Sequence, residues 1–180
     1  MTLVNMQHAI CNALKRDPWQ RKRNVEFFAE DKGNIIAAVK TKVAQMGLCA
    51  VVSTPGLNSD KPDSFTPVGL SNVVVTCFES PLLNRSKANR ATALNAAERI
   101  ACVLAKALFN AHVKNPAVFG PPAFVKIESG MVGDSERDAM LVYTVTFRVL
   151  AELTGDMEKE PYDPNIGDGA ETPEPEPPEE

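Results

Sequence analysis

Residues 141–150 read LVYTVTFRVL, and their period of two decides the fold class. Apolar side chains fill one set of alternate positions and mainly polar side chains fill the other, as in a strand with one buried face. The first set is Leu141, Tyr143, Val145, Phe147 and Val149, and the second is Thr144, Thr146, Arg148 and, further on, Glu152. We predict that this strand closes the domain and covers a hydrophobic core with one face.

Two more strands are expected beside this one. The residues from Phe124 to Ser129 also alternate, which predicts a half-buried strand, and the turn-forming stretch from Gly130 to Asp138 would join the two as a hairpin. Further upstream, the segment from Ser71 to Phe78 contains the run VVVTCF, which is apolar on both faces. Such a run is typical of a central strand that is covered on each side.

Helical spacing appears in three places. A short amphipathic N-terminal helix is predicted from Leu3, Met6, Ile10 and Leu14 behind a possible N-cap at Thr2, and it ends before Asp17-Pro18. A second helix begins at Asn34 and ends at Gly47, with an apolar face of Ile35, Ile36, Val39, Val43 and Met46. A long helix from about Ser86 to Ala111 has the apolar face Leu94, Ala97, Ile100, Ala101, Leu104, Ala107 and Leu108.

Adding short strands at Val25 to Glu30 and Leu48 to Ser53, and a surface loop from Thr54 to Pro67, gives the order α-β-α-β-β-α-β-β. The predicted class is α+β, a mostly antiparallel sheet packed with two main helices and the short N-terminal one. We expect residues 1–153 to form a single domain. Residues 154–180 are rich in Pro and Glu with few large apolar side chains, so we expect them to be disordered.

Charge divides the chain at the same place. Residues 154–180, called the acidic segment below, contain ten acidic residues and one lysine, a net charge of −9. Because the whole chain carries −4, residues 1–153 carry +5. A mildly basic body could attract an anionic partner or the acidic segment itself, and net charge does not choose between them.

Cysteine usage and hydropathy favour the cytosol of the producing cell. Cys11, Cys49, Cys77 and Cys102 are scattered, without CxxC spacing, and each lies in an apolar stretch, so we expect reduced, buried thiols. The first 16 residues lack the apolar centre of a signal peptide, and no uninterrupted apolar run reaches the ~18 residues of a membrane span.

The sequence offers no motif for catalysis, a cofactor or a metal. It contains no GxSxG, GxxxxGK[ST], HExxH or GxGxxG pattern, and His8 and His112 have no obvious companion ligands. Glu26, Glu30 and Asp31 could supply a carboxylate pair or bind a hard cation, but acids at a turn before a capped helix are a simpler interpretation. We expect a protein that is not an enzyme and that needs no cofactor.

Two stretches are candidates for recognition. Basic residues (Lys15, Arg16, Arg21, Lys22 and Arg23) surround the single tryptophan, Trp19, and could contact nucleic acid, form a solvated face or meet another subunit. The connection from Glu79 to Arg85, with Leu82, Leu83 and Asn84, follows the central strand and could be an oligomer contact or an ordinary loop.

A family resemblance adds to these observations. VVVTCFESPLLNR followed by the Ala-rich RATALNAAERIACVLAKAL, then FVKIES and LVYTVTFRVLAEL, resembles the tail terminator and tail completion proteins of long-tailed phages. The front half, VEFFAEDKGNIIAAVKTKVAQMGLCAVVSTPG, is also similar to related virion proteins. The resemblance covers roughly Val25 to Leu153 and lies in element order and hydrophobic texture.

The resemblance implies a tail-terminator-like subunit of the phage neck that serves head-tail joining. Such proteins form a homo-oligomeric ring, commonly a hexamer, that caps the tail tube and meets the head-side connector. The protein would be assembled in the cytoplasm of a bacterial host and would reside in the virion, without membrane contact. The loop from Thr54 to Pro67, the Glu79 to Arg85 connection and the Gly130 to Asp138 hairpin would carry the contacts. The interface residues we predict are Trp19, Arg21, Arg23, Leu82, Leu83, Asn84, Arg85, Asp134 and Arg137.

Two other hypotheses stay open. The basic 15–23 segment could make the chain a nucleic-acid or protein-binding module with the acidic segment as an intramolecular competitor, and direct contact with nucleic acid is not decided by the sequence. An enzyme using Glu26, Glu30 or Asp31 comes last. The acidic segment is a departure from the compact members of the family that the chain resembles.

Overall fold

The computed structural model describes residues 3–30, 34–59, 68–84, 91–106, 122–133 and 139–153. Over these ranges the chain is an α+β protein with a six-stranded, mostly antiparallel sheet. Its strands are β1 (Glu26–Ala29), β2 (Leu48–Ser53), β3 (Leu57–Asn58), β4 (Val68–Glu79), β5 (Ala123–Val132) and β6 (Met140–Glu152). Its helices are α1 (Leu3–Arg16), α2 (Pro18–Lys22), α3 (Ile35–Met46), α4 (Pro81–Asn84) and α5 (Ala93–Ala105).

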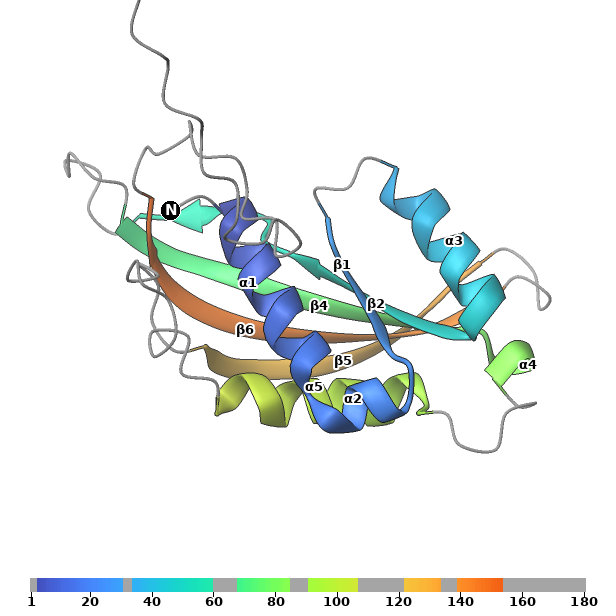
Figure 1. Ribbon diagram of the computed structural model, residues 1–180. Coiled ribbons are helices and arrows are strands. Elements are labelled where there is room, and N and C mark those ends of the chain that lie inside the picture. The colour runs from blue at the N-terminus through green and yellow to red at the C-terminus, as the bar shows by residue number, and fades with distance from the viewer. Residues whose placement is uncertain are drawn as a thin grey trace, which may run out of the picture.

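The strands lie side by side in the order β1-β2-β4-β6-β5 (Figure 1), so β1 and β5 are the two edges of this path. The pair β1–β2 is parallel because α3 returns the chain across the sheet between them. The other described pairs are antiparallel, and the short β3 pairs with β4 beyond the part that β2 covers. The expectation of mostly antiparallel pairing is therefore confirmed.

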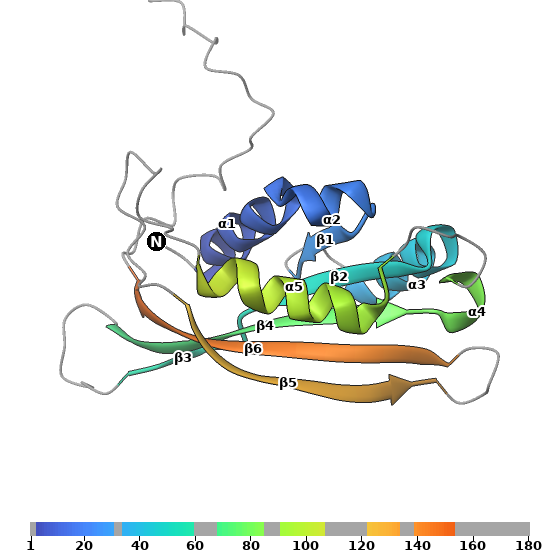
Figure 2. The same ribbon diagram turned by 90° about the horizontal axis from the view of Figure 1, so that it is seen from below.

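Helices cover the two faces of the sheet unequally. Helices α1 and α5 lie on the same side of β4 and β6 (Figure 2), and the main core lies between them and the sheet. Its fully buried side chains include Met6, Ile10 and Leu14 of α1, Ile100 and Leu104 of α5, and Val73, Val75, Val145 and Phe147 of the sheet. On the opposite face of β2, α3 forms a smaller core with Val39, Val43, Cys49 and Val51.

Several predictions from the sequence are confirmed. The Asn34 side chain accepts a hydrogen bond from the backbone N–H of Ala37 (3.1 Å) and so caps α3. Gly47 ends this helix in the left-handed conformation, at φ 79°, which favours glycine. The central position of the VVVTCF run is confirmed in β4, but the run is not buried on both faces, because Val74 on the second face is only half-buried. The alternation read in residues 141–150 is confirmed in β6 from Val145 onward, where Val145, Phe147 and Val149 are fully buried, whereas at the start of the strand Val142 is buried and Leu141 and Tyr143 are half-buried.

The helix predictions need three corrections. The predicted bounds of the N-terminal helix are confirmed by α1, but with 14 residues it is as long as the other main helices rather than short. Helix α5 begins at Ala93 rather than Ser86, since the Thr92 side chain caps it, and it ends at Ala105. Ile36 is 67% exposed and Leu94 is 39% exposed, so the apolar faces of α3 and α5 are narrower than the sequence suggested. Ser86, Ala107 and Leu108 lie outside the described residues.

Three short elements were missed. Helix α2 follows Asp17, whose side chain caps it, and has Pro18 at its first position, which is a known start signal. Strand β3 lies within the stretch that we predicted to be an irregular loop, and α4 lies in the connection after β4.

The prediction that β5 is half-buried is wrong. Nine of its ten residues are exposed, and Ile127 is the exception.

Candidate interaction surfaces

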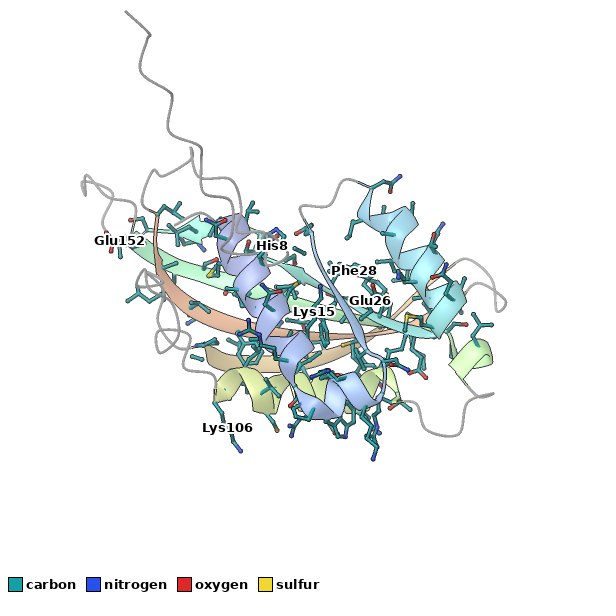
Figure 3. The ribbon with its side chains drawn as sticks, in the orientation of Figure 1. His8, Lys15, Glu26, Phe28, Lys106 and Glu152 are labelled. Atoms are coloured by element: carbon teal, nitrogen blue, oxygen red, sulfur yellow. The ribbon has the colours of Figure 1, made fainter. Side chains whose placement is uncertain are left out.

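Residues that could perform chemistry are dispersed in the described part of the chain. No group of three or more His, Cys, Asp or Glu side chains among these residues could hold a metal ion. Glu26, one of the acids considered for a carboxylate pair, instead forms an ion pair with Lys42 of α3 (3.0 Å), beside Phe28 on β1 (Figure 3). Glu30 lies past the end of β1, and Asp31 and His112 are outside the described residues.

The cysteines divide into two kinds. Cys11, Cys49 and Cys77 are buried and free, as expected, and burial raises the pKa of the Cys49 thiol to about 12. Burial also raises the pKa of Cys77 far above its usual range. Cys102 is exposed, so the expectation that all four thiols lie in the core is wrong for this residue. It lies on the outer side of α5, where helical spacing turns it away from Ile100 and Leu104.

Asp17 holds the corner where α1 meets α2. Its carboxylate accepts from the backbone N–H of Gln20 (3.1 Å), which caps α2, and from Nε and Nη2 of Arg99 on α5 (3.1 and 2.5 Å). The hydrogen bond from Arg99 is the main cause that holds the pKa of Asp17 below its ordinary value, against the opposing effect of burial. The Asp17 side chain is 6% exposed, so this pair ties the N-terminal helices to α5.

Around this corner lies the α2 basic surface, which we define as Lys15, Arg16, Arg21, Lys22 and Arg23. Lys15, Arg16, Arg21 and Lys22 are exposed, and Figure 3 shows Lys15 on the second half of α1. None of the five side chains forms an ion pair with another described residue. The nearest buried acid, Asp17, is already neutralised by Arg99.

Trp19 is half-buried and packs against the main core. The guanidinium of Arg23 lies over its ring, 4.5 Å from the ring centroid, as in a cation–π contact. The ring is therefore used within the chain on both sides. It offers little free surface for stacking on a base, whereas Arg21 remains exposed.

The connection after β4 begins with residues that are hydrogen-bonded to the rest of the fold and continues with an exposed leucine. The buried carboxylate of Glu79 accepts from the backbone N–H of Ala93 (2.7 Å) and so places a negative charge at the start of α5. The backbone N–H of Ser80 donates to the carbonyl of Gly47 (3.0 Å). Leu83 in α4 is 43% exposed. Leu82 and Asn84 belong to the same helix, and Arg85, Asp134 and Arg137 lie outside the described residues.

Strand β5 concentrates exposed apolar surface on the sheet edge. Four of its large hydrophobic residues are between 42% and 70% exposed, namely Phe124, Val125, Met131 and Val132. Its register against β6 shifts between Phe124 and Lys126, which leaves Val125 as a bulge. The two charged side chains of the strand, Lys126 and Glu128, pair with each other (2.8 Å).

Next to this edge, part of the sheet faces away from α1 and α5. Register places Leu70 opposite Leu150, Asn72 opposite Arg148 and Val74 opposite Thr146 on this face. Leu150 is 55% exposed, and no described helix lies on this side of β5 and β6 (Figure 2). We call these six residues the open sheet face.

No helix within the described ranges is long and apolar enough to cross a membrane. Neither the protein-family models nor the curated proteins include a match to this chain.

Sequence reasoning found part of these surfaces and missed the rest. The basic cluster was visible as charge in the chain. The Asp17–Arg99 pair joins residues 82 positions apart, so no local pattern could reveal it. The exposure of β5 could not be predicted from its pattern, because the residues of an edge strand can alternate as regularly as those of a half-buried strand. Gly130 was the one sign that β5 is not a regular, well-packed strand, since glycine weakens a strand interior.

Proposed function

We propose that the chain is a structural subunit of a phage virion, a tail terminator or tail completion protein that forms a ring at the head-proximal end of the tail. The observation that carries the proposal is β5, a ten-residue edge strand with exposed apolar side chains on a strand bonded on one side to β6. The resemblance of the element order to such proteins supports the particular role. The tail tube and the head-tail connector would be its partners in the virion, which is assembled in the bacterial cytoplasm.

The physical argument concerns how edge strands are protected. An edge strand presents a row of backbone N–H and C=O groups, and soluble proteins usually guard it with charges, proline or short length. Strand β5 is long and has no proline, its bulge lies near its beginning at Val125, and its charges at Lys126 and Glu128 neutralise each other. Such a strand suits pairing or packing with another chain, and exposed Met131 and Val132 would add apolar area to the contact.

A ring requires that β5 meets a different surface on the neighbouring copy. Contact between unlike surfaces repeats around an axis and closes when the rotation permits, whereas β5 meeting β5 would give a two-fold dimer. The opposite edge, β1, has four residues and differs from β5 in length and burial. This asymmetry between the edges supports the head-to-tail arrangement that a ring needs.

Light scattering after size exclusion, together with electron microscopy, tests the proposal. We expect a closed ring for the wild type. Met131→Glu places a charge on the proposed contact and should shift the protein toward monomers. Ile36→Glu is the matched control, because Ile36 on α3 is exposed to nearly the same extent (67% against 70%). A monomeric wild type, a two-fold dimer, or equal effects of the two substitutions would each contradict the ring.

The α2 basic surface favours a second candidate function, a module that binds an anionic partner. Its exposed, unpaired Lys and Arg side chains suit phosphate or carboxylate groups. Half-buried Trp19 makes base stacking a poor explanation, so contact with nucleic acid would rely on phosphates. Binding of a short DNA duplex that weakens steeply with salt would favour this function over assembly alone.

A further inference from the structure

We propose that the α2 basic surface is a docking site for the acidic segment, residues 154–180, of the same chain. The inference goes beyond ring assembly and does not depend on it. It names one occupant for a surface whose basic side chains form no ion pair with the described residues.

The first step is the state of the basic side chains. Five of them lie on the end of α1, on α2 and just after it: Lys15, Arg16, Arg21, Lys22 and Arg23. Helix α1 contains no acidic residue, and the Asp17 carboxylate at this corner is bonded to Arg99. The two helices therefore carry like charges close together, and these charges repel one another unless an anionic group binds between them.

The second step is the choice of anion. The acidic segment has ten acidic residues and one lysine within 27 positions, and it is joined to the body by a covalent link. Attachment gives a linked partner an effective concentration of the order of millimolar, well above that of a free ligand at ordinary protein concentrations. With the Trp19 ring occupied by the core and by Arg23, the surface recognises charge rather than bases, which suits a carboxylate-rich chain.

The third step is reach. Glu152, at the C-terminal end of β6, lies toward the side of the molecule where α1 begins, whereas α2 follows the other end of α1 (Figure 3). A helix of 14 residues is about 21 Å long, whereas 27 extended residues span up to about 90 Å. The acidic groups in the second half of the segment can therefore reach the surface within one chain.

A zero-length carbodiimide cross-linker applied to the full-length protein tests the proposal, because it joins carboxylates to lysines in direct contact. We expect mass spectrometry to find cross-links from residues 154–180 to Lys15 and Lys22. Lys40, exposed on α3, is the internal control and should be joined far less often. In 0.5 M NaCl the screening length falls to about 4 Å, and the cross-links to Lys15 and Lys22 should be lost.

Two variants and one mixing experiment sharpen the test. Arg21→Glu keeps both reporter lysines and should lower their cross-linking roughly threefold, whereas Arg148→Glu, which changes an exposed arginine on the open sheet face, should leave it unchanged. In an equal mixture of isotope-labelled and unlabelled protein, the cross-links should join segments of one label only.

Three results would overturn the proposal. The first is cross-linking of Lys40 as strong as that of Lys15, and the second is cross-links that join labelled to unlabelled chains. The third is an absence of cross-links at Lys15 and Lys22, and binding of a short DNA duplex there would then assign the surface to nucleic acid.

Discussion

Strands β1 and β5 are the two edges of one sheet, yet the fold treats them in opposite ways. Strand β1 has four residues, and Phe27 and Ala29 on one of its faces are buried in the main core beside α1. On its other face α3 approaches, and Lys42 pairs with Glu26. Strand β5 has ten residues, nine of them exposed, and it contains a bulge and a glycine. It borders the open sheet face, on which no described helix lies (Figure 2).

The comparison of β1 with β5 indicates which region stabilises the fold and which region suits contact with another copy. Burial of apolar surface is the main favourable contribution to folding, so the free energy of unfolding should depend on the region between α1, α5 and the central strands. The β5 region contributes less to that core and exposes more apolar area, which suits contact with another copy. The first three predictions below each pair a residue from the covered region with a residue of β5, and the fourth concerns Asp17 alone.

The largest expected effect is that of Phe147→Ala. Phe147 is fully buried and its ring packs edge-on against Phe124 of β5 (5.9 Å between centroids). Loss of the ring from the core should lower the free energy of unfolding by about 3 to 5 kcal/mol, measured by urea denaturation. Phe124→Ala removes the same ring pair from the exposed side (49% exposed) and should cost about 1 kcal/mol. Equal costs would contradict the division between core and edge.

Asp17→Ala comes next. The substitution removes the cap of α2 and leaves Arg99 without its buried partner, so we expect a loss of about 2 to 3 kcal/mol in the free energy of unfolding. The matched change in β5 is Glu128→Ala, which breaks the pair with Lys126. Because both of these side chains are more than half exposed, the change should stay below about 0.5 kcal/mol.

Gly69→Ala should have a smaller effect, about 1 to 3 kcal/mol, by displacing β3. A Cβ atom built on Gly69 would meet the backbone carbonyl oxygen of Asn58 at 2.1 Å, so the two strands must separate. Gly130→Ala in β5 is the control, since nothing lies within 4 Å of the added atom. We expect thermal unfolding to show a lower Tm for the first variant and an unchanged or slightly higher Tm for the second.

The smallest effect is the pH dependence due to Asp17. Its pKa in the folded protein is lowered from 3.8, mainly by the hydrogen bond from Arg99, so the folded state favours the ionised carboxylate. The contribution of Asp17 to the free energy of unfolding is therefore complete at a pH above its pKa in the unfolded chain. This contribution is lost as the pH falls through its pKa in the folded protein. The stability difference between the wild type and Asp17→Asn should be constant near neutrality and narrow below about pH 4. A difference that widens toward acid pH would contradict this role.

Local signals explain which parts of the fold could be predicted. Asn34, Gly47 and the alternation along residues 141–150 each act over a few positions, so their consequences for α3 and β6 were readable in the chain. The start of α5 was placed too early because Thr92, its cap, competes with Ser86 as an N-terminal signal. The proposed contact interface remains a prediction, since Arg85, Asp134 and Arg137 lie outside the described residues.

The sequence by itself determined the periods of the helices and strands, the antiparallel order of the later strands and the separation of basic body from acidic segment, because each is a property of neighbouring residues. Only the tertiary structure decided that β5 would be an edge, that Asp17 would meet Arg99 and that Glu79 would hold the start of α5. These contacts join residues far apart in the chain. Their formation depends on which apolar surfaces pack together, and no local pattern specifies that choice.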